Sequence, residues 1–547
     1  MGMREQSVQK EHTEEQSVAK GFAVLSAAGI IVKLLSLLYI PFLLSIIGEE
    51  GNGIYAAAYQ VYVLIYAISN SGMPVALSKL VSELIAVGNY KDAVRSFKIA
   101  RFLLLVIGVV MAAVMFFTAY PISIMMHYEK SYMAILALSP TLLFTSVASA
   151  YRGYFQGRGN MTPTAVSQII EQVVNTIFTL VFAAAFLRFG VEAACAGGTV
   201  GTSLGALAAA VFLVWYHNNR GKMRIPSEYR FKKTERYSYS QLVKRIIAYS
   251  VPIALSIGLQ YTGNLIDVSV TKARLLAAGF ADETASEMYS FLYKYQQLLN
   301  APIAVVASLG STILPAVSAA VALRNKRLVK SRVDFAFRLC FMVTIPSAVG
   351  FSVLSGPIYR LLRYGQGSYL MMYGSAAVIL MAIVQIQTSI LQGSGKFYPV
   401  TFNLVLGIIG KIVTNYILIG IPEININGAI IGSVVSYCIP IALNGMLIRK
   451  RLKIRTRLPG LALKPAAAAG VMGAGVYALY RIFAGALFFL KNAYLANALA
   501  TLVSIATGAL IYAAVLLALK GLSREELDML PGRIAARLPE SVLKYIQ

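Results

Sequence analysis

The sequence predicts an all-α, polytopic membrane protein: about 14 transmembrane helices, in two parallel six-helix repeats with two further C-terminal helices. Three observations predict it: the composition, a series of long apolar segments and an internal repeat. Of the 547 residues, 58% are hydrophobic and only 13% are charged, and the mean hydropathy is +0.68. Soluble domains average about 25% charged residues. This number of charged residues is too small to cover the surfaces of several soluble domains. Most of the protein surface must therefore face lipid.

The apolar segments give the predicted spans directly. A helix that crosses a bilayer needs about 20 mostly apolar residues. The first such run is too long for the core of a signal peptide and is therefore interpreted as a retained membrane helix. In chain order the predicted spans are 22–47, 54–87, 102–120, 132–155, 163–187, 193–216, 246–271, 288–320, 335–357, 369–393, 399–420, 426–448, 465–490 and 495–519.

The distribution of Lys and Arg predicts the orientation of these spans. With the N-terminus inside, the inside segments carry 36 of the 49 Lys and Arg residues, the outside segments carry 8, and 5 lie within spans. Cytoplasmic loops are enriched in basic residues, and the loss of one helix would invert everything after it. We therefore expect both termini in the cytoplasm. The net charge of +26 is then mostly a topological signal, and no nucleic-acid partner is expected.

The sequence gives no sign of a metal, a redox centre or a nucleotide. Cys195, Cys340 and Cys438 each stand alone in an apolar run, without the spacing of a metal or redox motif. We interpret them as small buried hydrophobic residues. No G-x-x-x-x-G-K-[ST] motif occurs, so no ATP site is expected. We predict no cofactor, no metal and no enzymatic activity.

An internal repeat divides the chain. The segment from Gln156 to Pro163 recurs as Gln392 to Pro399, 236 residues later, and each copy lies in a short turn between two predicted spans. Six helices per copy is an even number, so the two copies share an orientation. Transporters with parallel repeats bind their substrate between the halves. The predicted domains are a cytoplasmic N-tail (1–20), an N-terminal six-helix lobe (21–240), a C-terminal six-helix lobe (241–460), two extra helices (461–519) and a cytoplasmic amphipathic C-tail (520–547).

Charged residues within the predicted spans fall into two groups. Lys79 and Glu83, and likewise Asp334 and Arg338, stand four residues apart near helix ends, where we expect helix-end ion pairs. Glu171 and Lys411 lie in the corresponding fifth and eleventh helices. These two are candidates for inter-lobe partners or for an ion-coupling relay of protons or sodium. The sequence does not choose between these alternatives.

Polar residues also recur at helical spacing in spans two, seven and eight, and ionisable residues inside a membrane are functional candidates. Their faces could line one shared cavity. The alternative is hydrogen bonding between helices, together with interfacial tyrosines. The predicted substrate-binding residues are Lys33, Tyr39, Tyr59, Tyr62, Tyr66, Asn70, Gln260, Asn264, Asp267, Tyr293, Lys294, Gln297 and Asn300.

Three blocks of sequence resemble a known family. They are G-E-E-G-N-G-I-Y from Gly48 and G-M-P-V-A-L-S-K-L-V-S-E from Gly72, followed by G-N-Y-K-D-A from Gly88. With the repeated QG-x-G turn, they are similar to the multidrug/oligosaccharidyl-lipid/polysaccharide (MOP) flippase superfamily. The most similar branch contains polysaccharide biosynthesis/SpoVB-like proteins and MurJ-type lipid II flippases. The resemblance implies that basic cavity residues meet a pyrophosphate. Lys33 stands where that pattern has an arginine, and Tyr39 where it has a second one.

The function implied by the resemblance is flipping of an undecaprenyl-pyrophosphate-linked saccharide, with lipid II of peptidoglycan biosynthesis as the first candidate. Alternating access would carry it from the inner to the outer leaflet, coupled to the membrane potential, H⁺ or Na⁺. The alternatives are a flippase for another lipid-linked polysaccharide unit, a MATE-like cation-coupled drug or metabolite exporter, a lipid-dependent glycosyltransferase and a scaffold. The expected setting is the bacterial cytoplasmic membrane. The expected partners are membrane lipids, the polyprenyl-linked glycan and cell-wall synthesis proteins, with a monomer as the simplest assembly.

Overall fold

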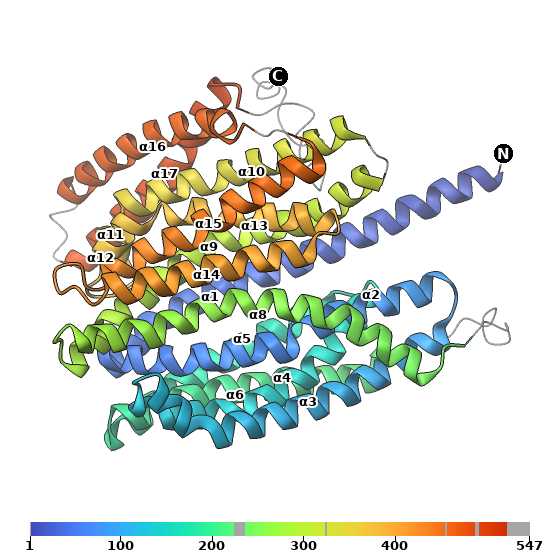
Figure 1. Ribbon diagram of the computed structural model, residues 1–547, viewed down its shortest axis with the longest axis horizontal. Coiled ribbons are helices and arrows are strands. Elements are labelled where there is room, and N and C mark those ends of the chain that lie inside the picture. Colours follow the sequence, from blue (N-terminus) through green and yellow to red (C-terminus); the bar gives the residue numbers. More distant parts are fainter. Residues whose placement is uncertain (1, 224–235, 323–324, 455–456, 487–491, 522–547) are drawn as a thin grey trace. The chain divides into compact units, whose positions relative to one another are not determined.

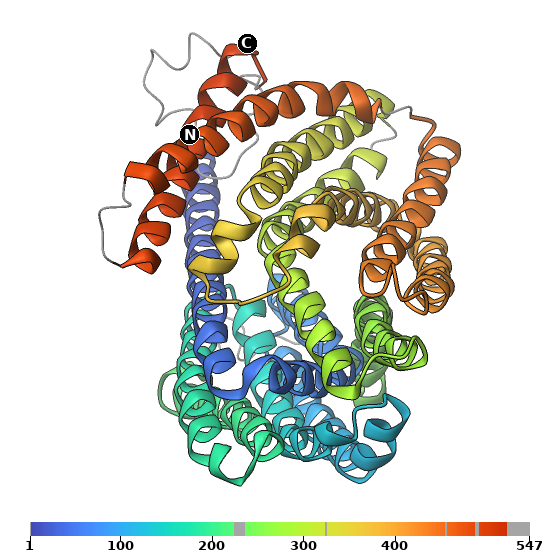
Figure 2. The ribbon, with the colours of Figure 1, turned by 90° about the vertical axis from the view of Figure 1, so that its left-hand side faces the viewer.

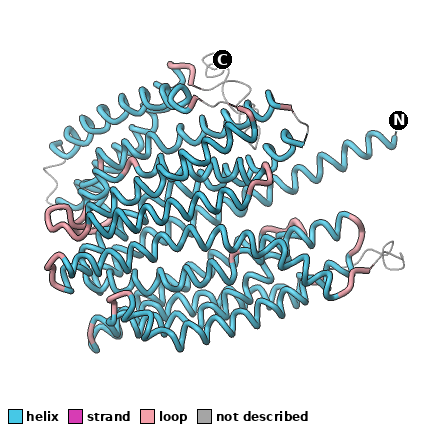
Figure 3. The backbone as a smooth tube through the Cα atoms, viewed as in Figure 1, coloured by secondary structure: helices cyan, strands magenta, loops and turns pink. Residues whose placement is uncertain are grey.

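The computed structural model describes residues 2–223, 236–322, 325–454, 457–486 and 492–521. In these ranges the chain consists of helices joined by short turns, and no strand occurs (Figure 3). The all-α prediction is confirmed. The contacts divide the chain into two compact units, Met1–Ala273 and Arg274–Gln547, which are described separately below as unit 1 and unit 2.

Unit 1 contains the helices of the first predicted lobe together with the whole of the seventh predicted span (Figure 1). The contact boundary therefore falls later than the repeat boundary at 240, which follows sequence similarity rather than packing. Its helices are α1 (Gly2–Asn70), α2 (Gly72–Ala86), α3 (Tyr90–Met125), α4 (Tyr132–Gly157), α5 (Thr162–Phe186), α6 (Val191–Tyr216) and most of α8 (Tyr239–Ala277), with short helical turns at Glu129–Ser131, Leu187–Phe189 and His217–Gly221.

Two breaks shape the first 86 residues. Within α1, Gly48 has a φ of 70° and a ψ of −176°, which splits the helix into the first and second predicted spans. This part of φ/ψ space is essentially restricted to glycine. A second break at Ser71 separates α2 from α1. It precedes Pro74, whose nitrogen cannot donate to the carbonyl four residues earlier. The predicted N-tail is not a separate segment, because α1 begins at Gly2.

Small residues let α5 and α6 approach closely. Gly197, Gly201 and Gly205 are spaced four apart on α6, and an added Cβ on each would lie 2.3–2.6 Å from an atom of α5. For Gly201 that atom is the backbone nitrogen of Thr179. Glycines at this spacing allow two membrane helices to pack backbone against backbone.

Unit 2 holds the rest of the second repeat, from the eighth predicted span on, and the two extra helices. The pair α16–α17 packs together, and α16 also contacts α10 (Figure 1, Figure 2). The tenth predicted span is bent by 54° between α12 and α13. The helices are α9 (Asp282–Ala322), α10 (Lys326–Val353), α11 (Ser355–Leu361), α12 (Ser368–Gly374), α13 (Ala377–Gly393), α14 (Phe397–Leu418), α15 (Asn427–Leu452), α16 (Leu458–Ala486) and α17 (Ala493–Ala518).

The repeated turn has the same backbone in both units. Gly159 and Gly395 have φ values of 75° and 78°. The N–H of Gly159 donates to Gln156 O at 2.9 Å, and the N–H of Gly395 donates to Gln392 O at 2.9 Å. The sequence similarity at an offset of 236 residues therefore corresponds to one repeated helix–turn–helix structure.

By length and composition, 11 helices of the described residues can cross a membrane, or up to 12 if the bent pair α12–α13 counts as one span. Each of the fourteen predicted spans falls mostly on described helix, with breaks at Ser71, at Leu354 and at residues 375–376, and the end of the thirteenth span lies outside the described residues. One of the eleven, Ala27–Ile85, covers the first two predicted spans. The count of fourteen stays a prediction, and the C-tail after residue 521 lies outside the described residues.

Gly48 offers a direct test of the first break. An added Cβ at Gly48 has no atom within 4 Å, so only the backbone conformation opposes a side chain there. We expect Gly48→Ala to lower the free energy of unfolding by about 1–3 kcal/mol. Thermal unfolding in detergent measures it. Gly29→Ala is the matched control, because Gly29 lies within helix and is equally uncrowded. An unchanged midpoint for Gly48→Ala would contradict this explanation of the break.

Candidate functional site

Tyrosines form a ladder along one face of α1. The rings of Tyr55, Tyr59, Tyr62 and Tyr66 follow one another with centroids 6.2, 5.7 and 6.0 Å apart. Successive steps of three and four residues place side chains on the same face of a helix. The predicted polar face of span two is therefore present as a continuous stack of rings.

The ladder faces α4 and ends in a buried amide. The phenol of Tyr62 lies near Thr145 and the phenol of Tyr66 lies near Ser149, both on α4. Asn70 is fully buried, and its Oδ1 accepts a hydrogen bond of 2.8 Å from Ser146 Oγ. Asn70, predicted to bind substrate, thus connects two helices of unit 1.

An ion pair stands beside the ladder. Arg152 Nη2 on α4 lies 2.6 Å from Glu171 Oε2 on α5, and Arg152 Nε donates to Ser167 Oγ at 3.0 Å. Both charges interact with the phenol of Tyr66. Glu171 therefore has a partner inside its own unit. Arg152 was not a candidate from the sequence, because this residue was assigned to the inside turn. The helices α4 and α5 are joined by a short turn and lie antiparallel, which brings Arg152 close to Glu171.

On α8, Asp267 is fully buried, Asn264 is half-buried, and Tyr261 interacts electrostatically with Tyr59 and Tyr66. The seventh span therefore brings at least one polar ring to the tyrosine ladder. The side chain of Gln260, another predicted site residue, lies outside the described residues.

Two candidates on the first span lie in different surroundings. Lys33 is exposed, and the structure pairs it with no acidic side chain among the described residues. Tyr39 is half-buried and lies close enough to Tyr59 to interact with it electrostatically. Lys33 is thus an exposed cation within a predicted membrane span.

Lys294 on α9 is different, because it is fully buried. Its Nζ donates to the carbonyl oxygens of Tyr364 and Gln366, the latter at 3.2 Å, and it lies 4.9 Å from the centroid of the Phe291 ring. Of its predicted companions on α9, Tyr293 is buried, whereas Gln297 and Asn300 are half-buried. In this conformation the ammonium of Lys294 is hydrogen-bonded to backbone carbonyls rather than facing open space.

The other charged candidates from the predicted spans differ in their partners and burial. Lys79 and Glu83 form the expected ion pair, at 3.9 Å, with both side chains exposed. The structure shows no such pair between Asp334 and Arg338 among its described residues, and Asp334 Oδ1 is buried without a hydrogen bond. Lys411 on α14 is buried. Whether it meets Glu171 stays a prediction.

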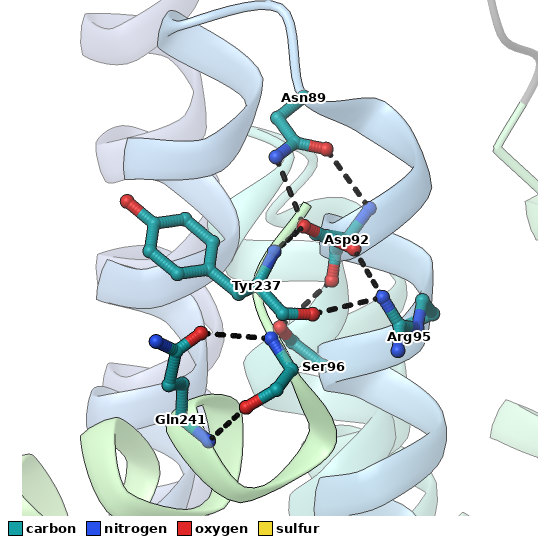
Figure 4. A network of polar contacts seen from close by, with 7 residues as sticks. Asn89, Asp92, Arg95, Ser96, Tyr237 and Gln241 are labelled. Atoms are coloured by element: carbon teal, nitrogen blue, oxygen red, sulfur yellow. Dashed lines mark hydrogen bonds and ion pairs between the residues drawn. The ribbon is translucent and has the colours of Figure 1, made fainter. Parts of the chain in front are cut away.

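A polar network that sequence analysis did not single out surrounds Asp92 at the start of α3 (Figure 4). Asp92 is fully buried and lies 2.8 Å from Arg95 Nη1. It also accepts 3.0 Å and 2.9 Å hydrogen bonds from Asn89 Nδ2 and from the backbone N–H of Tyr237. Arg95 Nη1 donates in turn to Tyr237 O at 3.0 Å. One carboxylate thus fixes the segment before α8 to the start of α3.

The same segment is capped by a second local motif. The N–H of Ser238 donates to Gln241 Oε1 at 2.8 Å, and the N–H of Gln241 donates to Ser238 Oγ at 3.2 Å (Figure 4). This reciprocal pair is a capping box. Asn89 plays the corresponding role for α3, accepting from the Asp92 N–H at 3.2 Å. The spacings N-x-x-D and S-x-x-Q were the signals in the sequence. Among the described residues no group of three His, Cys, Asp or Glu could hold a metal.

A family profile described as "Polysaccharide biosynthesis protein" matches residues 18–321, which is more than half of the chain. The chain belongs to the polysaccharide biosynthesis protein family. The resemblance in the sequence blocks is therefore confirmed. In this family context the chain is a multi-pass membrane protein of the transporter type.

Two relatives from Bacillus subtilis (strain 168) cover most of the chain. The lipid II flippase MurJ is 27% identical over 456 residues, which is 79% of this chain and 82% of the relative. Stage V sporulation protein B is 27% identical over 457 residues, with 82% and 87% covered. Relatives with the same identity to this chain thus carry both names.

Solved structures share the fold. An inward-facing multidrug resistance MATE family transporter of the MOP superfamily has a TM-score of 0.64 and 16% identity, covering 79% of this chain and 98% of that one. Lipid II flippase MurJ in an inward closed conformation has a TM-score of 0.63 and 14% identity, covering 90% and 98%. At these identities the likeness shows the fold alone.

The buried charge of Asp92 predicts a stability effect. We expect Asp92→Asn to lower the free energy of unfolding by about 3 kcal/mol, because Arg95 and the Tyr237 N–H lose a buried anion. Glu83→Gln removes an exposed ion pair instead and should change it by less than about 1 kcal/mol. Thermal unfolding in detergent compares the two variants. Equal midpoints would contradict a stabilising role for the network.

Proposed function

We propose that this chain is a flippase that moves an undecaprenyl-pyrophosphate-linked saccharide, with lipid II as the first candidate, to the outer leaflet of the bacterial cytoplasmic membrane. The observation that carries the proposal is Lys33, exposed in a predicted membrane span and without an acidic partner among the described residues. A charge at that depth is costly and marks a substrate or ion pathway. The likeness to the lipid II flippase MurJ over 79% of this chain supports an anionic lipid.

The mechanism follows from the chemistry of the side chains. Lys33 attracts the diphosphate, while the polyprenyl tail stays in lipid. The phenols of Tyr59, Tyr62 and Tyr66 offer hydroxyl donors and flat apolar rings to the sugars. The two repeated halves then alternate their access from the inner to the outer side. The Lys and Arg distribution predicts both termini in the cytoplasm.

The second candidate is a cation-coupled exporter, which the MATE structure with the same fold favours. An exporter of cationic drugs needs an available carboxylate. Glu171, one of the two acidic candidates, is paired with Arg152 at 2.6 Å. The pairing reduces the attraction of Glu171 for a cation, which favours the flippase. Dye efflux from cells that express the chain separates the two candidates.

Access to lipid II tests the first candidate. The host flippase is depleted, this chain is expressed, and an external lipid-II-cleaving enzyme reports how much lipid II reaches the outer leaflet. We expect restored access, and a loss of about tenfold or more for Lys33→Ala, because one charge-assisted hydrogen bond contributes about 1.5–3 kcal/mol. Lys33→Arg should retain transport, since the charge is kept.

Lys79→Ala is the matched control, because Lys79 is also an exposed lysine but is paired with Glu83 at a helix end. It should transport normally. Continued protection of lipid II with good expression would exclude lipid II as the substrate and leave another lipid-linked polysaccharide unit. Full transport by Lys33→Ala would contradict the role of Lys33.

The driving force gives a separate prediction. An inside-negative potential favours the outward movement of a negative charge, and each charge releases about 2.3 kcal/mol for each 100 mV. We expect valinomycin with high external potassium, which collapses the potential, to slow flipping. Nigericin, which dissipates only the pH gradient, should leave it unchanged. The reverse pattern would contradict coupling to the potential and point to a proton relay, for which Glu171→Gln is the first variant.

A further inference from the structure

A broken stretch of unit 2 forms a small structural element between α10 and α13. We call residues 354–376 the cap: it consists of α11, the loop 362–367 and α12, which lie together in Figure 1. The Lys and Arg distribution predicts this stretch on the outer side. Neither short helix continues into the next helix of the chain. Several backbone carbonyls of the cap therefore accept no hydrogen bond within a helix and need donors from elsewhere.

Lys294 supplies two of those donors. Its ammonium bonds to the carbonyls of Tyr364 and Gln366 in the loop. Gly365 and Gly367 have φ values of 64° and 96°, conformations that glycine adopts at little cost. They flank Gln366 and turn the chain within the loop, so that two nearby carbonyls reach one ammonium.

The neighbouring residue anchors the other end of the cap. Tyr295 Oη donates to Gly374 O at 2.7 Å. A Cβ on Gly374 would lie 2.5 Å from that hydroxyl oxygen, and one on Gly367 would lie 2.7 Å from the Cβ of Phe291. Successive residues of α9 thus hold both ends of the segment from the loop to α12.

One of the two extra helices, α17, also contacts the cap. Asn497 Nδ2 on α17 donates to Pro357 O at 3.2 Å, and Tyr494 Oη donates to Leu361 O at 3.1 Å. Arg363 of the loop lies 4.3 Å from the ring of Tyr494. The cap is therefore fastened to α9 and to α17, and all of these contacts lie within unit 2.

The contact between Lys294 and the loop can be exchanged for a stronger one. Backbone carbonyls are neutral acceptors, whereas phosphate oxygens are charged and make shorter, stronger hydrogen bonds to an ammonium. A diphosphate that reaches Lys294 would therefore displace the carbonyls of Tyr364 and Gln366. These carbonyls would then need new partners, most simply water, which requires the loop to move outward.

We propose that Lys294 is a latch: it keeps the cap closed through the carbonyls of Tyr364 and Gln366, and an anionic diphosphate head group releases it. The release by a diphosphate rests on the proposed function, whereas the latch itself does not. Lys294 thereby acts as a positioning residue that couples the arrival of the head group to opening on the predicted outer side.

Cysteine labelling measures the opening of the cap. Ser375 at the end of α12 is 4% exposed, and Ser375→Cys is a small change. In a background with Cys195, Cys340 and Cys438 replaced by alanine, a maleimide labels this position only when the cap opens. In nanodiscs, we expect Lys294→Met to raise the labelling rate by about tenfold or more, because the rate follows the open population.

Two matched controls accompany this variant. Lys272→Met removes another buried lysine, one that stacks on Tyr128 in unit 1, and should not change labelling of Ser375→Cys. A protein that retains only Cys340, which is fully buried in α10, should stay protected when Lys294 is replaced. Unchanged labelling of Ser375→Cys in Lys294→Met, with Cys340 protected, would overturn the latch.

If Lys294→Met exposes Cys340, that variant is unfolding, and Asn497→Ala decides instead. It removes a donor to the cap from α17 without touching Lys294. Faster labelling of Ser375→Cys would then support the fastened cap, and unchanged labelling would overturn it.

A second labelling experiment uses the protein with Lys294 unchanged and adds a lipid. Undecaprenyl diphosphate in the nanodisc should speed labelling of Ser375→Cys by about tenfold, whereas undecaprenol, which has no phosphate, should not. No effect of the diphosphate in a chain that restores lipid II access would overturn the trigger but leave the proposed function intact. A clear effect in a chain that fails the lipid II assay would support the latch and contradict lipid II as the substrate.

Discussion

The absence of water inside a bilayer is the constraint on which the rest of this structure depends. Each backbone carbonyl in the span must find a donor within the protein, so an unbroken helix is the default and each break needs side chains to serve it. At the cap, Lys294 and Tyr295 on one side and Asn497 on the other donate to carbonyls that the broken helices leave open. Breaks and buried donors therefore occur together.

The same constraint explains how charges are placed. Asp92 is buried where Arg95 and a backbone N–H can both reach it, and Glu171 is paired with Arg152 on the next helix. A buried charge left alone would cost several kcal/mol. Lys33 departs from this pattern, because it is exposed and no acidic residue of the described chain pairs with it. Among the charged residues of the predicted spans, such a lysine is the strongest candidate for an external anion.

The sequence predicts the parts of this fold that depend on periodicity. Long apolar runs identify the spans, and the glycines at 159 and 395 identify the repeated turn, because each needs a positive φ. Pairs on one helix, such as Lys79 with Glu83, also follow from spacing. Partners on different elements do not. Arg152 could not be matched to Glu171 without the packing of α4 on α5, and the partners of Lys294 are carbonyls, which every residue has and no sequence pattern distinguishes.

The two repeats keep their turns but differ in where their helices break. In the first half, the chain breaks at Ser71 before Pro74. In the second half, α9 continues through Pro315, which lies in a similar stretch of sequence 241 residues later. Conversely, α4 is continuous, but its counterpart in the second half is divided into α12 and α13 with a 54° bend. A break is where backbone polar groups must exchange partners if the helix moves. Because the breaks fall on different helices, a device built on a break in one half need not have an equivalent in the other half.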